Sequence, residues 1–168
     1  MAVRKPFIII GVMGGHEADA GTLEEARLVG EAVAQRGYIL LTGGGTGVMR
    51  AASEGAARAG GLVIGILPND RRRPLCGYPN EFVNIPIYTG MADARNVINA
   101  KTPAVVVALG GGPGTLSEIA LALNAGTPVI GLNAPAFTLA GEYPFFAART
   151  VAEVLEQMDR ILAGRSQK

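Results

Sequence analysis

Short apolar runs alternate with segments of helical periodicity along the 168-residue sequence, and this alternation restricts the fold more than any other feature. The apolar runs are PFIIIGVM, YILLT, GLVIGILP, PAVVVAL and TPVIGL, with weaker candidates at FVNIPIY and PFFAA. Continuous apolar runs of this length are typical of strands that are covered on both faces. Strands that alternate with helices form parallel sheets. We therefore expect a Rossmann-like, doubly wound α/β fold, with a mostly parallel sheet and helices on both faces.

The segments between these runs predict helices over residues 21–37, 48–59, 90–102, 114–126 and 150–164. In the first of them, Thr22 and Glu25 match a capping box, and Gly37 matches a C-terminal stop. No linker, internal repeat or low-complexity segment interrupts the pattern. We therefore expect residues 1–168 to form a single domain.

The charge balance argues against two large classes of partner. Lys and Arg together number 15 and Asp and Glu number 14, which leaves a formal net charge of +1. This balance gives no support for binding to nucleic acid or to a membrane surface. No apolar run approaches the ~18 residues of a membrane-spanning helix. Because Cys76 is the single cysteine, no internal disulfide is expected, and the chain is predicted to be cytoplasmic.

Glycine-rich segments follow three of the predicted strands. In open parallel sheets, ligands bind beyond the carboxyl ends of the strands. A helix that begins there offers free backbone N–H groups, which glycine leaves open to a phosphate. A tight turn is the alternative for any one loop, but two such loops at corresponding strand ends favour a nucleotide- or phosphate-binding domain. The candidate binding residues are Gly14, Gly15, Gly43, Gly44, Gly45, Thr46, Gly47, Gly111, Gly112, Gly114 and Thr115.

Other nucleotide and metal motifs do not occur. Neither glycine loop fits G-x-G-x-x-G, and no G-K-[ST] is present, so a dinucleotide dehydrogenase or a P-loop NTPase is not expected. The sequence has no Cys/His cluster, and we predict no metal site. His16, the single histidine, is interpreted as an ordinary loop residue in preference to a ligand contact.

Two charged residues lie on apolar helical faces. Helix 114–126 is apolar nearly all round, which predicts that the sheet covers one side and another helix or a second subunit covers the other. Glu118 is therefore expected to be buried, which is costly unless the carboxylate is paired or used. Arg95 lies on an apolar face and is expected to meet an anion, either Glu118 or a ligand phosphate. A structural ion pair and an active site both remain open at this point.

Two further charged segments are predicted to be exposed. Arg71 to Arg73 are interpreted as a solvated loop in preference to a lid that touches ligand. Arg50, Glu54 and Arg58 are spaced four residues apart, which predicts an ion-paired face on helix 48–59.

The succession GGGTGVM, GLVIGILP, MADARN and GGGPGTLSE resembles the LOG ("Lonely Guy") superfamily over nearly the whole chain. The family signature P-G-G-x-G-T-x-x-E is matched by Gly111, Gly112, Gly114, Thr115 and Glu118. Arg95 precedes Glu118 by 23 positions (118 minus 95), similar to the family spacing. The resemblance implies a homodimer or homotetramer with a nucleoside monophosphate site. It also implies that Arg95 and Glu118 serve N-glycosidic hydrolysis to free base and ribose 5-phosphate.

The chain departs from the hydrolytic members at named positions. Gly110 replaces the signature proline, Ala92 and Asn96 depart from M-H-x-R-K, and Ser117 replaces the first of two glutamates. This form is closer to a branch that includes molybdenum-cofactor carrier proteins, which bind a phosphorylated pterin. The older family label of lysine decarboxylase lacks chemical support, because Lys101 is poorly placed to form a Schiff base.

The main prediction is therefore an enzyme, a nucleoside 5′-monophosphate phosphoribohydrolase that requires no cofactor. The alternative is a non-catalytic carrier of the molybdenum cofactor. The bound small molecule would be a nucleotide monophosphate in the first case and the molybdenum cofactor in the second.

Overall fold

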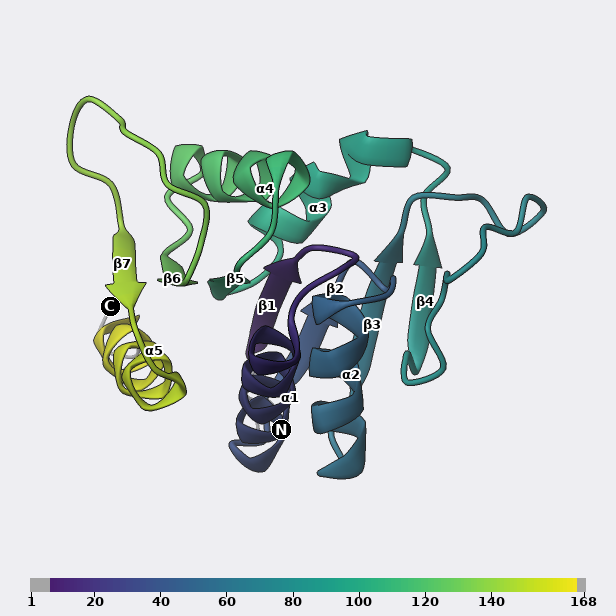
Figure 1. The fold of residues 1–168 in the computed structure, drawn as a ribbon, viewed down its shortest axis with the longest axis horizontal. Helices are drawn as coiled ribbons and strands as arrows, with labels where there is room; N and C mark the ends of the chain where they lie inside the picture. The colour runs from purple at the N-terminus through teal and green to yellow at the C-terminus, as the bar shows by residue number, and fades with distance from the viewer. Residues whose placement is uncertain (1–6, 166–168) are drawn as a thin grey trace, which may run out of the picture.

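Seven strands form one sheet in this computed structural model, which describes residues 7–165 (Figure 1). The strands are β1 (Ile9–Gly14), β2 (Ile39–Thr42), β3 (Val63–Leu67), β4 (Ile85–Tyr88), β5 (Val105–Leu109), β6 (Val129–Leu132) and β7 (Phe145–Ala148). Their order is β4-β3-β2-β1-β5-β6-β7, and each neighbouring pair is parallel. The predicted Rossmann-like parallel sheet is confirmed. The predicted first strand began at Pro6, which lies outside the described residues.

Helices cover both faces of the sheet, as expected (Figure 1). They are α1 (Ala20–Gln35), α2 (Val48–Arg58), the 3-10 helix η1 (Ala92–Arg95), α3 (Asn96–Lys101), α4 (Pro113–Asn124) and α5 (Val151–Arg165). Successive strand residues point to opposite faces. Val105 and Val107 therefore pack with α1, α2 and α5, whereas Val106 and Ala108 pack with α3 and α4. The core thus has two layers, one on each face of β5.

The ends of α1 differ in how well the sequence predicts them. Gly37 has φ +72°, a left-handed conformation that suits glycine, and the predicted stop just after the helix is confirmed. The N-terminal cap is Asp19, whose Oδ1 accepts a hydrogen bond of 2.9 Å from the Thr22 amide. The prediction of a cap at Thr22 was therefore wrong, because the aspartate three residues earlier already accepts from that amide.

The predicted helix over residues 90–102 is not continuous. Gly90 and Ala92 have φ of +64° and +48°, which a continuous right-handed α-helix does not accommodate. The chain therefore turns through η1 before α3 begins at Asn96. Arg95 lies at this junction, where its side chain is directed to the sheet and is buried.

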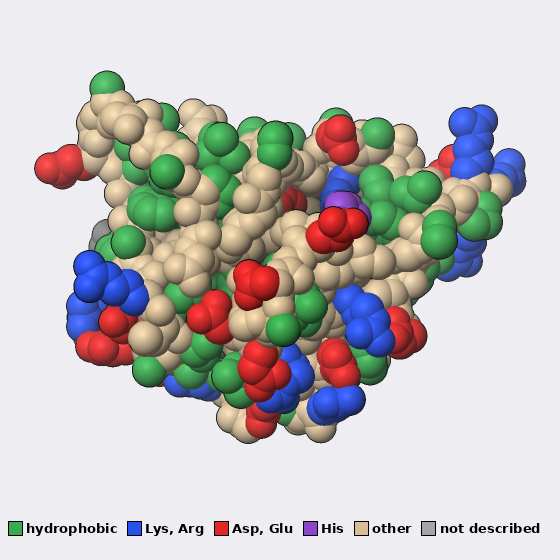
Figure 2. Space-filling view, viewed as in Figure 1, with side chains coloured by type: hydrophobic (Ala, Val, Ile, Leu, Met, Phe, Trp, Pro, Cys, Tyr) green, Lys and Arg blue, Asp and Glu red, His purple; other side chains and the backbone are tan. Residues whose placement is uncertain are grey.

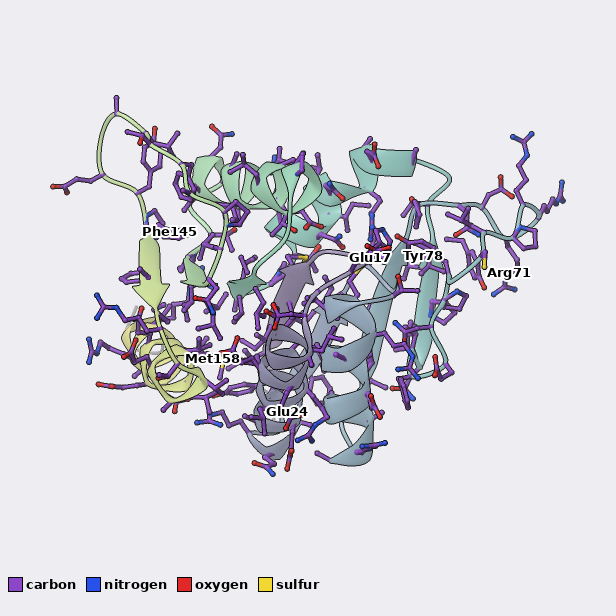
Figure 3. All side chains as sticks on the ribbon, viewed as in Figure 1. Glu17, Glu24, Arg71, Tyr78, Phe145 and Met158 are labelled. Atoms are coloured by element: carbon purple, nitrogen blue, oxygen red, sulfur yellow. The ribbon has the colours of Figure 1, made fainter. Side chains whose placement is uncertain are left out.

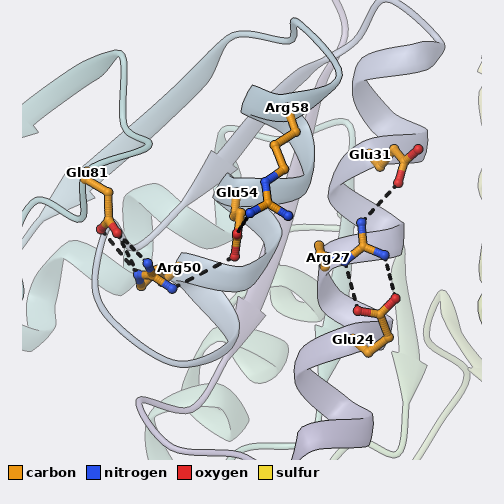
Figure 4. A network of polar contacts seen from close by, with 7 residues as sticks. All are labelled: Glu24, Arg27, Glu31, Arg50, Glu54, Arg58 and Glu81. Atoms are coloured by element: carbon orange, nitrogen blue, oxygen red, sulfur yellow. Dashed lines mark hydrogen bonds and ion pairs between the residues drawn. The ribbon is translucent and has the colours of Figure 1, made fainter.

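An ion-paired surface joins α2 to the segment that follows β3 (Figure 4). Arg50 pairs with Glu81 and lies 3.9 Å from Glu54, which also accepts from Arg58 at 2.6 Å. The predicted Arg50–Glu54–Arg58 face is confirmed, and Glu81 extends it. Of these contacts, the Arg50–Glu81 pair connects the first turn of α2 to the segment that follows β3.

The chain reverses its direction of winding at β1. From β1 it proceeds to β2, β3 and β4 on one side, and then returns to place β5, β6 and β7 on the other. The loops after β1 and β5 therefore diverge and leave a crevice between them. None of the helices within residues 7–165 is long and apolar enough to cross a membrane.

Candidate functional site

A cavity of about 550 Å³ lies where the loops after β1 and β5 diverge, and we call it the β1–β5 cavity. Its volume falls within the ~300–1,000 Å³ that is usual for small-molecule sites. The lining residues are Met13, Gly14, Gly15, His16, Met49, Asp93, Arg95, Asn96, Gly112, Pro113, Gly114, Thr115, Ser117 and Glu118.

The first turn of α4 forms one wall of the cavity. Gly112 precedes the helix and Pro113 is its first residue, so the missing N–H of proline falls where no intrahelical bond would form. The amides of Gly114 and Thr115 lie in the first turn, which has no acceptor within the helix. A Cβ at Gly112 or Gly114 would have no atom within 4 Å. This wall is therefore open to an anion.

Arg95 enters the cavity from the η1–α3 junction and is only 7% exposed. Its Nη1 donates hydrogen bonds to the carbonyl oxygens of Gly43 at 2.8 Å and Ile66 at 2.6 Å. Its guanidinium carbon also lies 6.0 Å from the ring centre of Tyr78. An ion pair with Glu118 was one of the two alternatives left open for Arg95, and it does not form within 4.0 Å in the described structure. Backbone carbonyls, rather than a carboxylate, satisfy Nη1.

Glu118 lines the cavity from α4 and is likewise 7% exposed. Its Oε1 accepts a hydrogen bond of 2.7 Å from Asn99 Nδ2 on α3. Burial raises the pKa of this carboxyl to about 7, although the Asn99 bond and the charge of Arg95 both oppose the rise. The expected burial of Glu118 is confirmed. A carboxyl group with this pKa exchanges a proton readily near neutral pH.

His16 links the β1–α1 loop to two other segments at the margin of the cavity. Thr46 Oγ1 donates to the His16 carbonyl at 3.2 Å and lies 3.2 Å from His16 Nδ1. Tyr78 Oη lies 2.9 Å from His16 Nε2. The Thr46 hydroxyl hydrogen is already donated to the His16 carbonyl, so Thr46 Oγ1 can only accept from the imidazole. This pattern assigns the ring proton to Nδ1, and Nε2 then accepts a hydrogen bond from the Tyr78 hydroxyl. The imidazole is thus held from both sides.

The figures place this cluster on the molecule. Figure 2 shows the single histidine on the surface in view, between acidic and apolar side chains. In Figure 3, Tyr78 belongs to the segment between β3 and β4 and lies toward the centre of the molecule, close to the loop that carries Glu17. Arg71 lies near the tip of the same segment, farther from the centre of the molecule. Its guanidinium carbon is 5.2 Å from the ring centre of Tyr88. Arg71 to Arg73 are exposed, as predicted, and they do not line the β1–β5 cavity.

The structure separates the predicted site residues into two groups. Gly14, Gly15, Arg95, Gly112, Gly114, Thr115 and Glu118 all line the β1–β5 cavity. Gly43 to Gly47 and Gly111 are not among the lining residues. Asn80 explains part of this, because its backbone and side-chain nitrogens donate to the carbonyls of Gly44 at 2.8 Å and Gly45 at 2.9 Å. The loop after β2 is therefore covered by residues 69–84, and its predicted role in phosphate binding stays a prediction.

The sequence interpretation missed several residues in and beneath the cavity. His16 was predicted to be an ordinary loop residue, yet it lines the cavity. Asn96 donates to Ser117 Oγ at 2.9 Å, and Asn99 donates to Glu118. The signal for the two asparagines was available, because they stand three residues apart in an otherwise largely apolar segment and hence on one helical face. Within residues 7–165, no group of three or more His, Cys, Asp or Glu side chains is placed to hold a metal ion.

Comparison with known proteins defines the class to which this fold and cavity belong. Residues 7–162 match the SLOG cluster4 family, and the chain is a member of that family. It is 46% identical over 126 residues to an uncharacterized protein of Archaeoglobus fulgidus, a match that covers 75% of this chain and 80% of that protein.

Two solved structures give more specific similarities. The molybdenum cofactor binding protein of Rippkaea orientalis is 37% identical, with a TM-score of 0.82 over 95% of this chain and 99% of that chain. The Moco carrier protein of Chlamydomonas reinhardtii is 40% identical, with a TM-score of 0.80 over 96% of this chain and 99% of that chain. These similarities favour the carrier alternative over the predicted hydrolase.

Proposed function

We propose that this protein binds a phosphorylated pterin in the β1–β5 cavity and carries the molybdenum cofactor as its cargo. The observation that carries the proposal is the convergence of three features on one cavity. These are the first-turn amides of α4 and the buried side chains of Arg95 and Glu118. The full-length similarity to two molybdenum-cofactor proteins supports a pterin over a nucleotide as the ligand.

The chemistry of the lining residues fits such a ligand. A phosphate group would accept hydrogen bonds from the amides of Gly114 and Thr115 and benefit from the positive end of the α4 dipole. A guanidinium has five N–H donors, so the Nη1 bonds of Arg95 leave donors for an anion. The amino group and ring N–H of a pterin are donors, and the Glu118 side chain keeps acceptor oxygens for them in either ionisation state. The cavity thus offers donors to the phosphate and an acceptor to the heterocycle.

Binding of the released cofactor tests the proposal directly. We expect native mass spectrometry under anaerobic conditions to detect a stoichiometric complex with the phosphorylated pterin liberated from a molybdoenzyme. At a ligand concentration of one hundred times Kd, the free energy of unfolding should rise by about 2.7 kcal/mol. Adenosine monophosphate at the same concentration is the matched control and should give a smaller rise. The proposal fails if the pterin leaves both the mass and the melting temperature unchanged.

Hydrolysis of nucleoside 5′-monophosphates is the second candidate, and the Glu118 carboxyl favours it. Its pKa of about 7 would allow it to act as a general acid or base beside a bound ribose. If this is the reaction, a panel of nucleoside monophosphates should release free base, as seen by chromatography. Glu118→Gln should then slow the release by at least ~100-fold. Pterin binding with no release of base from any nucleotide would support the carrier function and exclude the hydrolase.

A further inference from the structure

Asn99 is a buried asparagine that joins α3 to α4 beneath the cavity. It has no exposed surface, and its Nδ2 donates to Glu118 Oε1 at 2.7 Å. The other end of the same amide group, Oδ1, is also buried and has no hydrogen-bond partner within the described residues. The side chain thus satisfies the carboxylate with its donor and leaves its acceptor unused.

An unused buried acceptor calls for a physical reason. Leaving such an atom without a partner is destabilising, and most buried polar atoms in proteins are satisfied. An amide group presents a donor and an acceptor that exchange places when its plane rotates by 180°. In one orientation Asn99 donates to a carboxylate, and in the other it accepts from a protonated carboxyl group. A single amide group can therefore serve a carboxyl group in either of its ionisation states.

The protonated state of Glu118 bears on how an anion would bind in the β1–β5 cavity. Glu118 lines the same space as the α4 amides, which attract anions, so a bound phosphate would lie near a buried negative charge. The charged and titratable groups around it are few. Asp93, Arg95 and His16 line the cavity, and Tyr78 interacts with Arg95. Arg95 favours the ionised carboxylate, whereas an entering anion would favour the protonated form.

We propose that Asn99 is the positioning residue of Glu118. Its Nδ2 orients the ionised carboxylate. Once Glu118 has taken a proton from solvent, the amide group rotates by 180° and its Oδ1 accepts a hydrogen bond from the carboxyl group. An anionic ligand then enters beside a neutral side chain. Only this last consequence rests on the proposed function. The pKa of Glu118 near 7 supports the proposal, because burial makes the protonated state accessible at the pH of the cell.

Nuclear magnetic resonance of the ligand-free protein tests the interaction between Asn99 and Glu118. We would follow Glu118 Cδ and the side-chain amide of Asn99 between pH 5 and pH 9. Both signals should titrate with the same midpoint, because the Asn99 amide protons lose their charged acceptor when Glu118 is protonated. Asn99→Leu removes the donor and should raise the Glu118 midpoint by about one pH unit. Asn99→Val, which also lacks the donor and adds no second carboxyl group, should raise it as well.

A matched asparagine separates this role from a general effect of substitution. Asn124 lies at the exposed end of α4, and Asn124→Leu should leave the Glu118 midpoint unchanged. The proposal is overturned if the Asn99 amide signals stay constant through the Glu118 titration. It is also overturned if the Asn99 variants that fold keep the wild-type midpoint. The wild-type titration decides the matter even where Asn99→Leu fails to fold.

Calorimetry with inorganic phosphate tests the coupling to ligand. At pH 8, in buffers of different ionisation enthalpy, wild-type protein should take up as much as one proton for each phosphate bound. Glu118→Gln should bind phosphate with no uptake of a proton. Phosphate binding without proton uptake in the wild type would overturn the coupling. If phosphate and the pterin phosphate both fail to bind, the proposed function is wrong, while the resonance titration still decides the role of Asn99.

Discussion

Arg95 Nη1 donates a hydrogen bond of 2.8 Å to the carbonyl oxygen of Gly43, so the buried arginine ties the η1–α3 junction to the loop after β2. The same nitrogen donates to Ile66 at the end of β3. Gly43 leaves room for this contact, because a Cβ there would lie 2.3 Å from Arg95 Nη1. Arg95 therefore holds two strand ends together in addition to any contact that it makes with a ligand.

Arg95→Ala should destabilise the fold. The substitution removes two buried charge-assisted hydrogen bonds and leaves two carbonyl oxygens without their donor. We expect the free energy of unfolding in urea to fall by about 2–4 kcal/mol. Arg73, whose side chain is 89% exposed, provides the control, and Arg73→Ala should change stability by less than about 0.5 kcal/mol. Equal stability of wild type and Arg95→Ala would show that these bonds contribute nothing.

Glu118 should make stability fall as pH rises. Its pKa in the folded protein is about 7, whereas an unfolded glutamate has a pKa of about 4.3. The folded state binds the proton more tightly, so this contribution is fully present below pH ~4.3 and is lost as pH rises through about 7. The difference between the two pKa values corresponds to a contribution on the order of 4 kcal/mol.

Glu118→Gln should remove that dependence. At pH 8 the variant should melt roughly 5–10 °C above the wild type, and the gap should close at pH 5. The unused Oδ1 of Asn99 is available to accept from the new amide. Glu142→Gln, at an exposed glutamate, should show no such difference between the two pH values. Scanning calorimetry at both pH values checks the prediction, and parallel melting curves for Glu118→Gln and wild type would refute it.

Gly112→Val should block the cavity without disturbing the fold. No atom lies within 4 Å of the position of a Cβ at Gly112, so the side chain would occupy open space beside the α4 amides. We expect the melting temperature of the free protein to change little and the stabilisation by a phosphorylated pterin to disappear. Thermal melts with and without ligand measure both effects.

Two other glycines sharpen this test. Gly164, near the end of α5, also has open space around it, and Gly164→Val should retain the ligand effect. Gly111 differs, because it has φ +96° and a Cβ there would lie 2.1 Å from Thr115 Oγ1. Gly111→Val should therefore destabilise the free protein. Full ligand binding by Gly112→Val would show that the phosphate does not lie at this wall.

The fold was predictable because its signals are local. Each buried strand is a continuous apolar run such as Val105 to Leu109, and each glycine run follows a strand directly. The interruption at residues 90–95 was not predicted, because Ala92 is a good helix former. Its positive φ arises where the chain leaves β4 and where the Ala92 amide donates to the Pro68 carbonyl at 2.9 Å. Such a long-range contact leaves no trace in periodicity.

The site was only partly predictable, because some of its contacts join residues that are far apart in the sequence. Glu118, Gly112 and Thr115 belong to one strand–turn–helix unit, and a single sequence window reveals them. Which partner Arg95 would take was left open, because Gly43 and Ile66 become its neighbours only through the order of the strands. The cover over the loop after β2 comes from Tyr78 and Asn80, more than 30 residues further along the chain. His16 gains its role in this way too, through a contact with Tyr78 that spans 62 positions.

The sheet face that α3 and α4 share is only partly covered by helices, and we predict that a second copy of the chain covers the rest. Ile85 and Ile87 are exposed, and they pair in register with Ile64 and Ile66, which pack on the α3 and α4 side. Val97 on α3 is also exposed. Obligate interfaces commonly bury about 2,000 Å² or more, which requires an apolar surface of this kind. Light scattering at micromolar concentration should therefore report a mass of twice the 17.3 kDa chain or more.

A charge on this face should separate the subunits, because it would be buried without a partner at the interface. We expect Val97→Glu and Ile87→Glu to reduce the mass in light scattering to that of one chain. Leu28 is similarly exposed but lies on α1, on the opposite face, and Leu28→Glu should leave the assembly intact. A wild-type protein that scatters as a monomer would show that this apolar face has another partner or none. Dissociation by Leu28→Glu alone would place the interface over α1 instead.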